Sequence, residues 1–203
     1  MGHFCGGTII NNCYILSAAH CDVDGDRSKF VVLGTIYRTG EHGGVTHDVT
    51  RVINHPNYNP ETSENDINLL RVSPYITYNA AVQPMPIAAH AAQSGDAVVS
   101  GWGHLEYEGE FPEILQFFNT QIISDEECYE ELGGSRFIVS NLTICIRNPE
   151  GQGICQGDSG GPLVHNGGLH GVASWVVTPC GTAAPDVYAR VSAYVSWILA
   201  NAV

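Results

Sequence analysis

The sequence Gly-Asp-Ser-Gly-Gly-Pro at residues 157–162 is the most informative stretch of this 203-residue chain. Glycines beside a serine allow a tight turn whose backbone N–H groups point at one spot, where they can stabilise the negative charge that develops on a carbonyl oxygen. A serine hydroxyl is a weak nucleophile and needs a base, and that base needs an acid to orient it. The stretch therefore predicts a nucleophilic Ser159, and the rest of the chain should supply the base and the acid.

Two other segments supply candidates for these partners. Ser-Ala-Ala-His-Cys at residues 17–21 contains His20, and Asn-Asp-Ile-Asn-Leu-Leu at residues 65–70 contains Asp66 within an apolar run. An aspartate buried in such a run is costly unless it is paired, so we expect Asp66 to have a hydrogen-bonded or charged partner.

The order of the candidates along the chain separates three classes of hydrolase. Residues 157–161 also match G-x-S-x-G, the nucleophile turn of α/β-hydrolases, but those enzymes place the acid and the histidine after the serine. Only His165 and His170 follow Ser159, and both lie too close to it. The subtilisin order starts with an aspartate, and no acidic residue precedes His20. The order that remains is His, Asp, Ser.

Short apolar runs separated by Gly, Asn, Asp and Pro recur along the chain and predict an all-β sandwich or barrel. The expected strands are residues 7–10, 14–17, 30–33, 49–53, 67–72, 97–100, 117–123, 163–165, 169–175 and 186–191. Apolar residues at three- and four-residue steps predict a helix over residues 191–203. A shorter helix should begin at Ser124, because Glu127 completes a capping box. The proline-rich residues 83–86 are the candidate joint between two halves.

These three motifs resemble those of chymotrypsin-like serine proteases in residue type, order and spacing. The resemblance extends through nearly the whole chain and includes Cys-Gly-Gly at 5–7, His-Pro at 55–56, Gly-Trp-Gly at 101–103, Ser-Trp at 174–175 and Pro-Asp-Val-Tyr at 185–188. It implies two antiparallel six-stranded β-barrels and a C-terminal helix, with the first strand of the N-terminal barrel missing. A single peptidase domain would cover residues 1–203, with barrels at 1–84 and 85–190 and the helix at 191–203.

The resemblance also implies a role for each candidate residue. Ser159 would attack the scissile carbonyl, His20 would take its proton and pass it to the leaving amine, and Asp66 would orient the imidazole. The N–H groups of Gly157 and Ser159 would form the oxyanion hole, and no cofactor would be needed. The implied substrate-binding residues are Gly153, Ile154, Gln156, Ser174, Trp175, Val176 and Asp186.

Three of the implied substrate-binding residues bear on specificity. Gly153 stands where trypsin-like members carry Asp, and the β-branched Val176 stands where members with a wide pocket carry Gly. Together with Ile154 they predict an elastase-like preference for small or medium aliphatic P1 residues, or a broad chymotrypsin/elastase-type specificity. Asp186 at the pocket floor argues for a cationic P1 residue instead. We expect the obstruction by Val176 at the pocket mouth to determine the specificity, because a long basic side chain must pass it first.

Six of the seven cysteines form pairs if the resemblance holds. The implied disulfides are Cys5–Cys21, Cys128–Cys145 and Cys155–Cys180. Cys13 is left over, either as a free thiol or paired with a cysteine outside this chain. We favour the free thiol because cysteine packs as a small hydrophobic residue.

The N-terminus departs from the family pattern. In the family, zymogen cleavage creates an N-terminus such as Ile-Val-Gly-Gly, whose amino group pairs with the Asp that precedes the nucleophile, here Asp158. This sequence starts at Met1 without such a segment. It is either an incomplete sequence, which we favour, or a short zymogen-like form. The alternative function is a non-catalytic homologue that acts as a binding module, although all three triad residues are present.

Composition limits the partners and the location. Eight basic against 21 acidic residues give a net charge of −13, which opposes binding to nucleic acids and acidic membranes. We expect a monomer whose partners are protein or peptide substrates and protein inhibitors. The cysteines and the glycosylation motif at Asn141 favour a secreted protein, although many such motifs are unused.

A metal site is not expected. The histidines lack a recognisable zinc spacing. The two glutamates that bind calcium in some members of the family correspond to Thr35 and Gly44 here.

Overall fold

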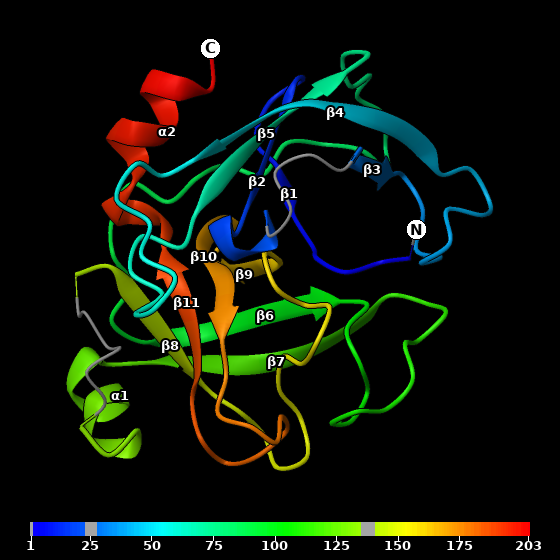
Figure 1. Cartoon of the computed structure of the whole chain (residues 1–203). Coiled ribbons are helices and arrows are strands. Elements are labelled where there is room, and N and C mark those ends of the chain that lie inside the picture. The colour runs from blue at the N-terminus through cyan, green and yellow to red at the C-terminus, as the bar shows by residue number, and fades with distance from the viewer. Residues whose placement is uncertain (1, 23–27, 135–140) are drawn as a thin grey trace.

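A computed structural model describes residues 2–22, 28–134 and 141–203, which form two antiparallel β-sheets (Figure 1). The N-terminal sheet has the strand order β1-β2-β5-β4-β3 and is open at β1 and β3. Its strands are β1 (Thr8–Ile9), β2 (Tyr14–Ser17), β3 (Phe30–Leu33), β4 (Val45–Asn54) and β5 (Asn68–Ser73).

The second sheet closes on itself as a six-stranded barrel in the order β10-β11-β8-β7-β6-β9. Its strands are β6 (Gly95–Gly101), β7 (Gln116–Ile123), β8 (Thr143–Arg147), β9 (Pro162–His165), β10 (Gly168–Trp175) and β11 (Asp186–Arg190). The prediction of an all-β fold with two barrel-like halves is confirmed, with one barrel closed and the other a five-stranded half-barrel. Closure leaves the second sheet without unpaired edges, whereas the first sheet keeps two.

Strand β8 is the strand that the apolar pattern did not predict. It has five residues and is flanked by the polar Thr143 and Arg147 at its ends, so its apolar run is too short to stand out. In the barrel it pairs with β7 on one side and with β11 on the other. Barrel closure, which is a tertiary effect, therefore makes this segment a strand.

Both predicted helices are present. Helix α1 (Asp125–Glu131) begins with the expected capping box, in which Ser124 Oγ accepts the Glu127 N–H at 3.2 Å and Glu127 Oε2 accepts the Ser124 N–H at 3.0 Å. Helix α2 (Val195–Asn201) is shorter than expected, because residues 191–193 form the separate 3₁₀ turn η2 (Val191–Ala193). No helix in the described ranges is both long and apolar enough to cross a membrane.

The largest hydrophobic core joins the two halves. It contains Leu16 and Leu69 from the N-terminal sheet, Leu169 and Val172 from the barrel, and Ile198 from α2. The two sheets are thereby held in a fixed relation, and side chains from both can meet at their junction.

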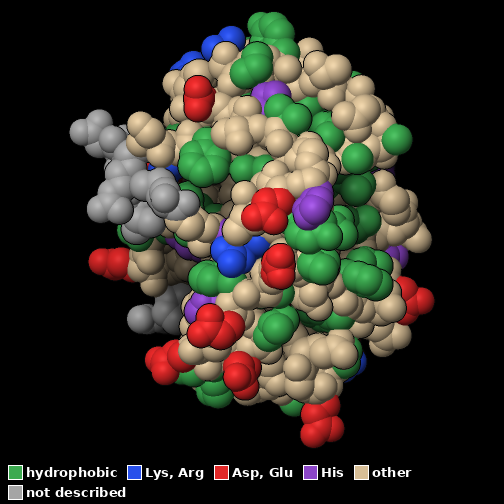
Figure 2. Space-filling model, turned by 90° about the vertical axis from the view of Figure 1, so that its right-hand side faces the viewer, with side chains coloured by type: hydrophobic (Ala, Val, Ile, Leu, Met, Phe, Trp, Pro, Cys, Tyr) green, Lys and Arg blue, Asp and Glu red, His purple; other side chains and the backbone are tan. Residues whose placement is uncertain are grey.

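On the outer face shown in Figure 2, acidic side chains are spread over the surface, most of them in its lower half.

Candidate active site

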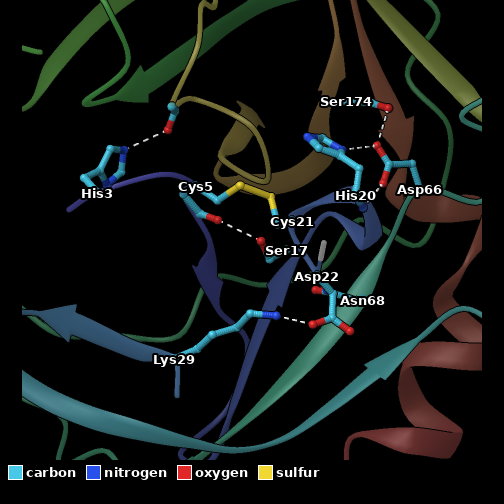
Figure 3. The surroundings of a disulfide bond; sticks show 12 residues. His3, Cys5, Ser17, His20, Cys21, Asp22, Lys29, Asp66, Asn68 and Ser174 are labelled. Carbon is cyan, nitrogen blue, oxygen red and sulfur yellow. Dashed lines mark hydrogen bonds and ion pairs between the residues drawn. A yellow bond between two sulfur atoms is a disulfide. The ribbon is translucent and has the colours of Figure 1, made fainter. Parts of the chain in front are cut away.

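His20 and Asp66 meet at the junction of the two sheets (Figure 3). His20 lies in the 3₁₀ turn η1 (Ala19–Cys21) directly after β2, and Asp66 lies just before β5. The His20 backbone N–H donates to Asp66 Oδ1 at 2.9 Å, and His20 Nδ1 lies 2.7 Å from Asp66 Oδ2. Because the carboxylate accepts the Nδ1 proton, Nε2 of a neutral His20 is left as the basic nitrogen.

Asp66 is only 1% exposed, and its carboxylate is satisfied by a third donor. Ser174 Oγ on β10 donates to Asp66 Oδ2 at 2.6 Å, so this hydrogen bond links the barrel to the N-terminal sheet (Figure 3). The sequence predicted Ser174 as a substrate-binding residue and gave no sign of this contact. Three donors account for the burial of a carboxylate inside an apolar strand region.

Ser159 lies on a tight turn that packs against the segment before His20. The Ser159 carbonyl accepts the Gly6 N–H at 2.7 Å, and the Gly160 N–H donates to the Ala173 carbonyl at 2.8 Å. Gly160 has a φ of +78°, and a Cβ there would lie 2.2 Å from Ser17 Oγ. Only glycine fits this approach, which brings the turn beside the histidine segment.

The Ser159 hydroxyl forms no hydrogen bond to His20 among the described residues. Catalytic hydrogen bonds are often long without substrate, so this does not oppose a nucleophilic role. Within the described ranges, the Gly157 and Ser159 N–H groups also have no hydrogen-bond partner. Two unpaired N–H donors on one turn are what an oxyanion needs.

His3 makes a further contact with this turn, at Gly157. Its φ is +99°, which favours glycine, and its carbonyl accepts a hydrogen bond from His3 Nε2 at 2.8 Å (Figure 3). The sequence contains no motif that marked His3. Burial lowers the pKa of His3, the Arg38 charge lowers it further, and the Gly157 hydrogen bond opposes both.

Asp158, the predicted activation-related residue, is held by two backbone N–H groups. Its Oδ1 accepts the Gly103 N–H at 2.8 Å and its Oδ2 accepts the Cys155 N–H at 2.9 Å. Burial raises the pKa of this carboxyl, and the two backbone hydrogen bonds oppose that rise. The carboxyl lines a cavity of about 450 Å³ and has no salt bridge to a cation among the described residues.

Two of the predicted pocket residues, Gly153 and Ile154, contact Asp186 at the start of β11. Asp186 is 2% exposed, and its Oδ2 accepts the Ile154 N–H at 2.7 Å. A Cβ on Gly153 would lie 3.1 Å from the same oxygen. Burial raises the pKa of Asp186 to about 7, against the Ile154 and Asn148 hydrogen bonds, which lower it.

The remaining predicted pocket residues lie in different surroundings. Ile154 is buried, and the half-buried Val176 packs against the same cluster. Trp175 is half-buried and packs against a neighbouring cluster that includes Val187. Gln156 is exposed, and its backbone carbonyl accepts the His104 N–H at 2.9 Å.

The cysteines pair as Cys5–Cys21, Cys128–Cys145 and Cys155–Cys180, with Cα–Cα distances of 6.3, 6.0 and 5.4 Å. All three distances lie in the usual disulfide range. Cys13 forms no disulfide within the described residues and lies half-buried against the main core. Among the described residues, the one group with metal-ligand atoms close together is Cys5, His20 and Cys21. Its two sulfurs are joined to each other, so it does not offer thiolate ligands.

Comparisons with known proteins agree with this geometry. Residues 1–198 match the family model described as Trypsin. The chain is 40% identical over 201 residues to Trypsin II-P29 of Gallus gallus, covering 97% of this chain and 78% of that protein. It is 38% identical over 206 residues to Cationic trypsin-3 of Rattus norvegicus, with the same coverage.

Among solved structures, neuropsin, a serine protease expressed in the limbic system of mouse brain, superimposes with a TM-score of 0.90. The sequence identity is 31%, and the match covers 98% of this chain and 89% of neuropsin. The similarity therefore includes both sheets and the junction between them.

Proposed function

This chain belongs to the trypsin family and is a serine endopeptidase, and we propose that it is a secreted member that cleaves after small or medium-sized aliphatic residues. The observation that carries the proposed specificity is the grouping of Gly153 and Ile154 around the buried Asp186, with Val176 packed in the same cluster as Ile154. The relatives named above are trypsins, so the proposal concerns how this chain differs from them.

The reaction would proceed through an acyl-enzyme. Ser159 Oγ attacks the scissile carbonyl carbon while His20 Nε2 takes the hydroxyl proton, and the carbonyl oxygen becomes an oxyanion held by the Gly157 and Ser159 N–H groups. His20 then gives its proton to the leaving amine as the C–N bond breaks. A water molecule, deprotonated by His20, repeats the attack on the ester and releases the second product.

Asp66 supports His20 through both steps. Its hydrogen bond to Nδ1 keeps the proton on that nitrogen and stabilises the imidazolium when His20 is charged. Ser174 holds the same carboxylate oxygen and so helps to fix its position. Residues 174–176, at the end of β10 and directly after it, would also offer backbone groups to an extended substrate.

The pocket favours an aliphatic P1 side chain over a basic one. We infer that the β-branched Val176, which packs beside Ile154, narrows the approach that a long basic side chain must pass. Beyond it, Asp186 already accepts a backbone N–H, and its pKa of about 7 leaves a large neutral fraction at neutral pH. A partly neutral carboxyl attracts a cation less than the ionised Asp that trypsin-like pockets use.

Matched peptide substrates that differ only at P1 test the specificity. We expect kcat/KM to be highest with Ala or Val and lower with Phe and Arg, and Ser159→Ala should abolish turnover of all four. Val176→Gly should shift the preference toward larger P1 side chains. A best rate with Arg or Phe on the unaltered enzyme would overturn the elastase-like assignment.

Secretion, partners and activation are also proposed. Three disulfides and an exposed Asn141 in a glycosylation motif support an oxidising, extracellular location. Detection of the protein in culture medium, with a mass shift on glycosidase treatment, tests both points. The proposed partners are protein substrates and protein inhibitors of a monomer, and Asp158 is proposed to pair with an amino group on activation.

A binding module without activity is the competing function, and covalent labelling separates the two. A fluorophosphonate probe should form an adduct on Ser159 of the activated protein. Absence of the adduct in a correctly folded, activated sample would favour the binding module.

A further inference from the structure

An aromatic ring lies directly against the backbone of Gly157, one of the two proposed oxyanion donors. Phe111 is in the connection between β6 and β7, and a Cβ built on Gly157 would fall 2.6 Å from Phe111 Cε1. The ring therefore occupies the space in which a side chain of Gly157 would stand. It limits the rotation of a residue that otherwise has the conformational freedom of glycine.

Phe111 is itself held by three neighbours. The His104 ring centroid lies 4.2 Å from its centroid in a T-shaped arrangement, and the His3 ring lies 5.9 Å away, also T-shaped. The Arg38 guanidinium carbon lies 5.3 Å from the Phe111 ring centroid, within the range of a cation–π interaction. His3 also donates to the Gly157 carbonyl, so two sides of Gly157 are held by one connected group.

Arg38 reaches this group from the N-terminal half, in the connection between β3 and β4. Its Nε donates to the Pro112 carbonyl at 3.0 Å, and its backbone N–H donates to the Glu113 carbonyl at 2.9 Å. The Leu115 N–H donates to the Ile36 carbonyl at 2.8 Å. These contacts dock the segment that carries Phe111 onto the β3–β4 connection of the N-terminal half.

The charge of Arg38 also affects the protonation of His3, the residue that bonds the Gly157 carbonyl. Burial lowers the pKa of His3, the Gly157 hydrogen bond opposes this, and the Arg38 charge lowers it further, so the neutral form of His3 is favoured. A carbonyl oxygen only accepts hydrogen bonds, so the neutral ring must carry its proton on Nε2 to bond Gly157. Arg38 therefore fixes Phe111 by direct contact and favours the neutral form of His3 through its charge.

We propose that Arg38 and Phe111 are positioning residues that hold the Gly157 N–H in line for the oxyanion. This inference rests on the proposed function, since it assumes that Gly157 stabilises an oxyanion. Neither side chain is needed to contact the substrate. Their removal should weaken stabilisation of the transition state more than binding of the ground state.

The variants Phe111→Ala and Arg38→Ala test this in the activated enzyme, with Arg38→Lys as the conservative variant and Tyr107→Ala as the control. Tyr107 lies in the same connection but is 42% exposed. Loss of a whole oxyanion donor lowers kcat by about 100-fold or more, so misplacement of one donor should lower it by roughly tenfold. We expect KM within about twofold of the unaltered enzyme, and a matching rise in the inhibition constant of a peptide aldehyde. Arg38→Lys should recover most of kcat, because a cation over the ring is kept.

Amide hydrogen exchange provides a readout that does not need turnover. Peptides that contain residues 156–160 should exchange faster in Phe111→Ala and Arg38→Ala, whereas Tyr107→Ala should leave their exchange unchanged. Unchanged kcat and unchanged exchange in both alanine variants would overturn the inference. A fall in thermal midpoint with kcat unaffected would also overturn it, because that result describes packing alone.

The two proposals fail in different ways. If the unaltered, activated enzyme hydrolyses no peptide substrate and forms no fluorophosphonate adduct, the proposed function fails. If it is active and the alanine variants match it in kcat, only the positioning roles fail.

Discussion

Replacing Asp186 with Asn should remove a pH-dependent loss of stability that the unaltered protein carries in its substrate pocket. The carboxyl is 2% exposed, and burial raises its pKa from 3.8 to about 7. Asn has nearly the same shape, and its side-chain oxygen can still accept the Ile154 N–H. The substitution therefore removes the titration while keeping the hydrogen bond.

The magnitude follows from the difference in pKa between the folded and unfolded states. A carboxyl group whose pKa is raised on folding loses its proton first in the unfolded chain, so stability falls as the pH rises from about 3.8 to about 7. At 1.36 kcal/mol for each pKa unit, the full loss is about 4 kcal/mol. Below pH 3.8 this loss is absent, and above pH 7 it is complete.

Urea unfolding of both proteins between pH 4 and pH 8 measures this quantity. The free energy of unfolding of the Asn variant minus that of the unaltered protein should rise by about 4 kcal/mol across the range. Parallel pH profiles for the two proteins would refute the reasoning, because they would mean that Asp186 titrates alike in both states.

Ionisation of the Asp186 carboxyl should also change the preference for the P1 residue. The ratio of kcat/KM for P1 Val to that for P1 Arg should fall as the pH rises through about 7, since the ionised carboxyl favours a cation. Effects on the catalytic step that both substrates share cancel in this ratio. In the Asn variant the ratio should be flat with pH.

Three further substitutions have expected outcomes. Ser174→Ala removes one of three donors to Asp66, so kcat should fall by roughly tenfold with KM little changed, as steady-state kinetics would show; an unchanged kcat would mean that the other two donors suffice. Gly160→Ala places a Cβ 2.2 Å from Ser17 Oγ at a φ of +78°, so the free energy of unfolding should fall by about 2 kcal/mol or more, and equal stability in urea would contradict the close approach. Ser124→Ala removes the cap of α1 and should cost about 1 kcal/mol of stability in the same assay without affecting kcat, whereas an altered kcat would show that α1 influences the active site.

Much of the fold and site could be predicted because local patterns and function-bearing motifs agree. The turn at residues 157–162 needs glycine at positions where the backbone is left-handed or closely packed. The glycines of the motif therefore indicate the backbone geometry of the turn directly. The capping box of α1 is likewise local, because both of its hydrogen bonds join residues three positions apart. Such features are encoded within a few residues.

The unpredicted features depend on contacts between distant segments. Strand β8 forms because its backbone groups pair with β7 on one side and with β11 on the other. The hydrogen bond from Ser174 to Asp66 joins residues 108 positions apart, and the contact of Arg38 with Phe111 joins the two halves. Single-sequence patterns do not record which distant side chains become neighbours, so these contacts became visible only in three dimensions.

The division of the active site between two sheets has a consequence for how the protein is made. His20 and Asp66 belong to the N-terminal sheet, whereas Ser159 and Ser174 belong to the barrel side, and the shared core around Leu16 and Leu169 holds the halves together. A nascent chain in which only one half has folded has either the proposed base or the proposed nucleophile in place, never both. Proteolytic competence thus arrives last in the folding sequence, which protects unfinished copies of the chain from cutting one another.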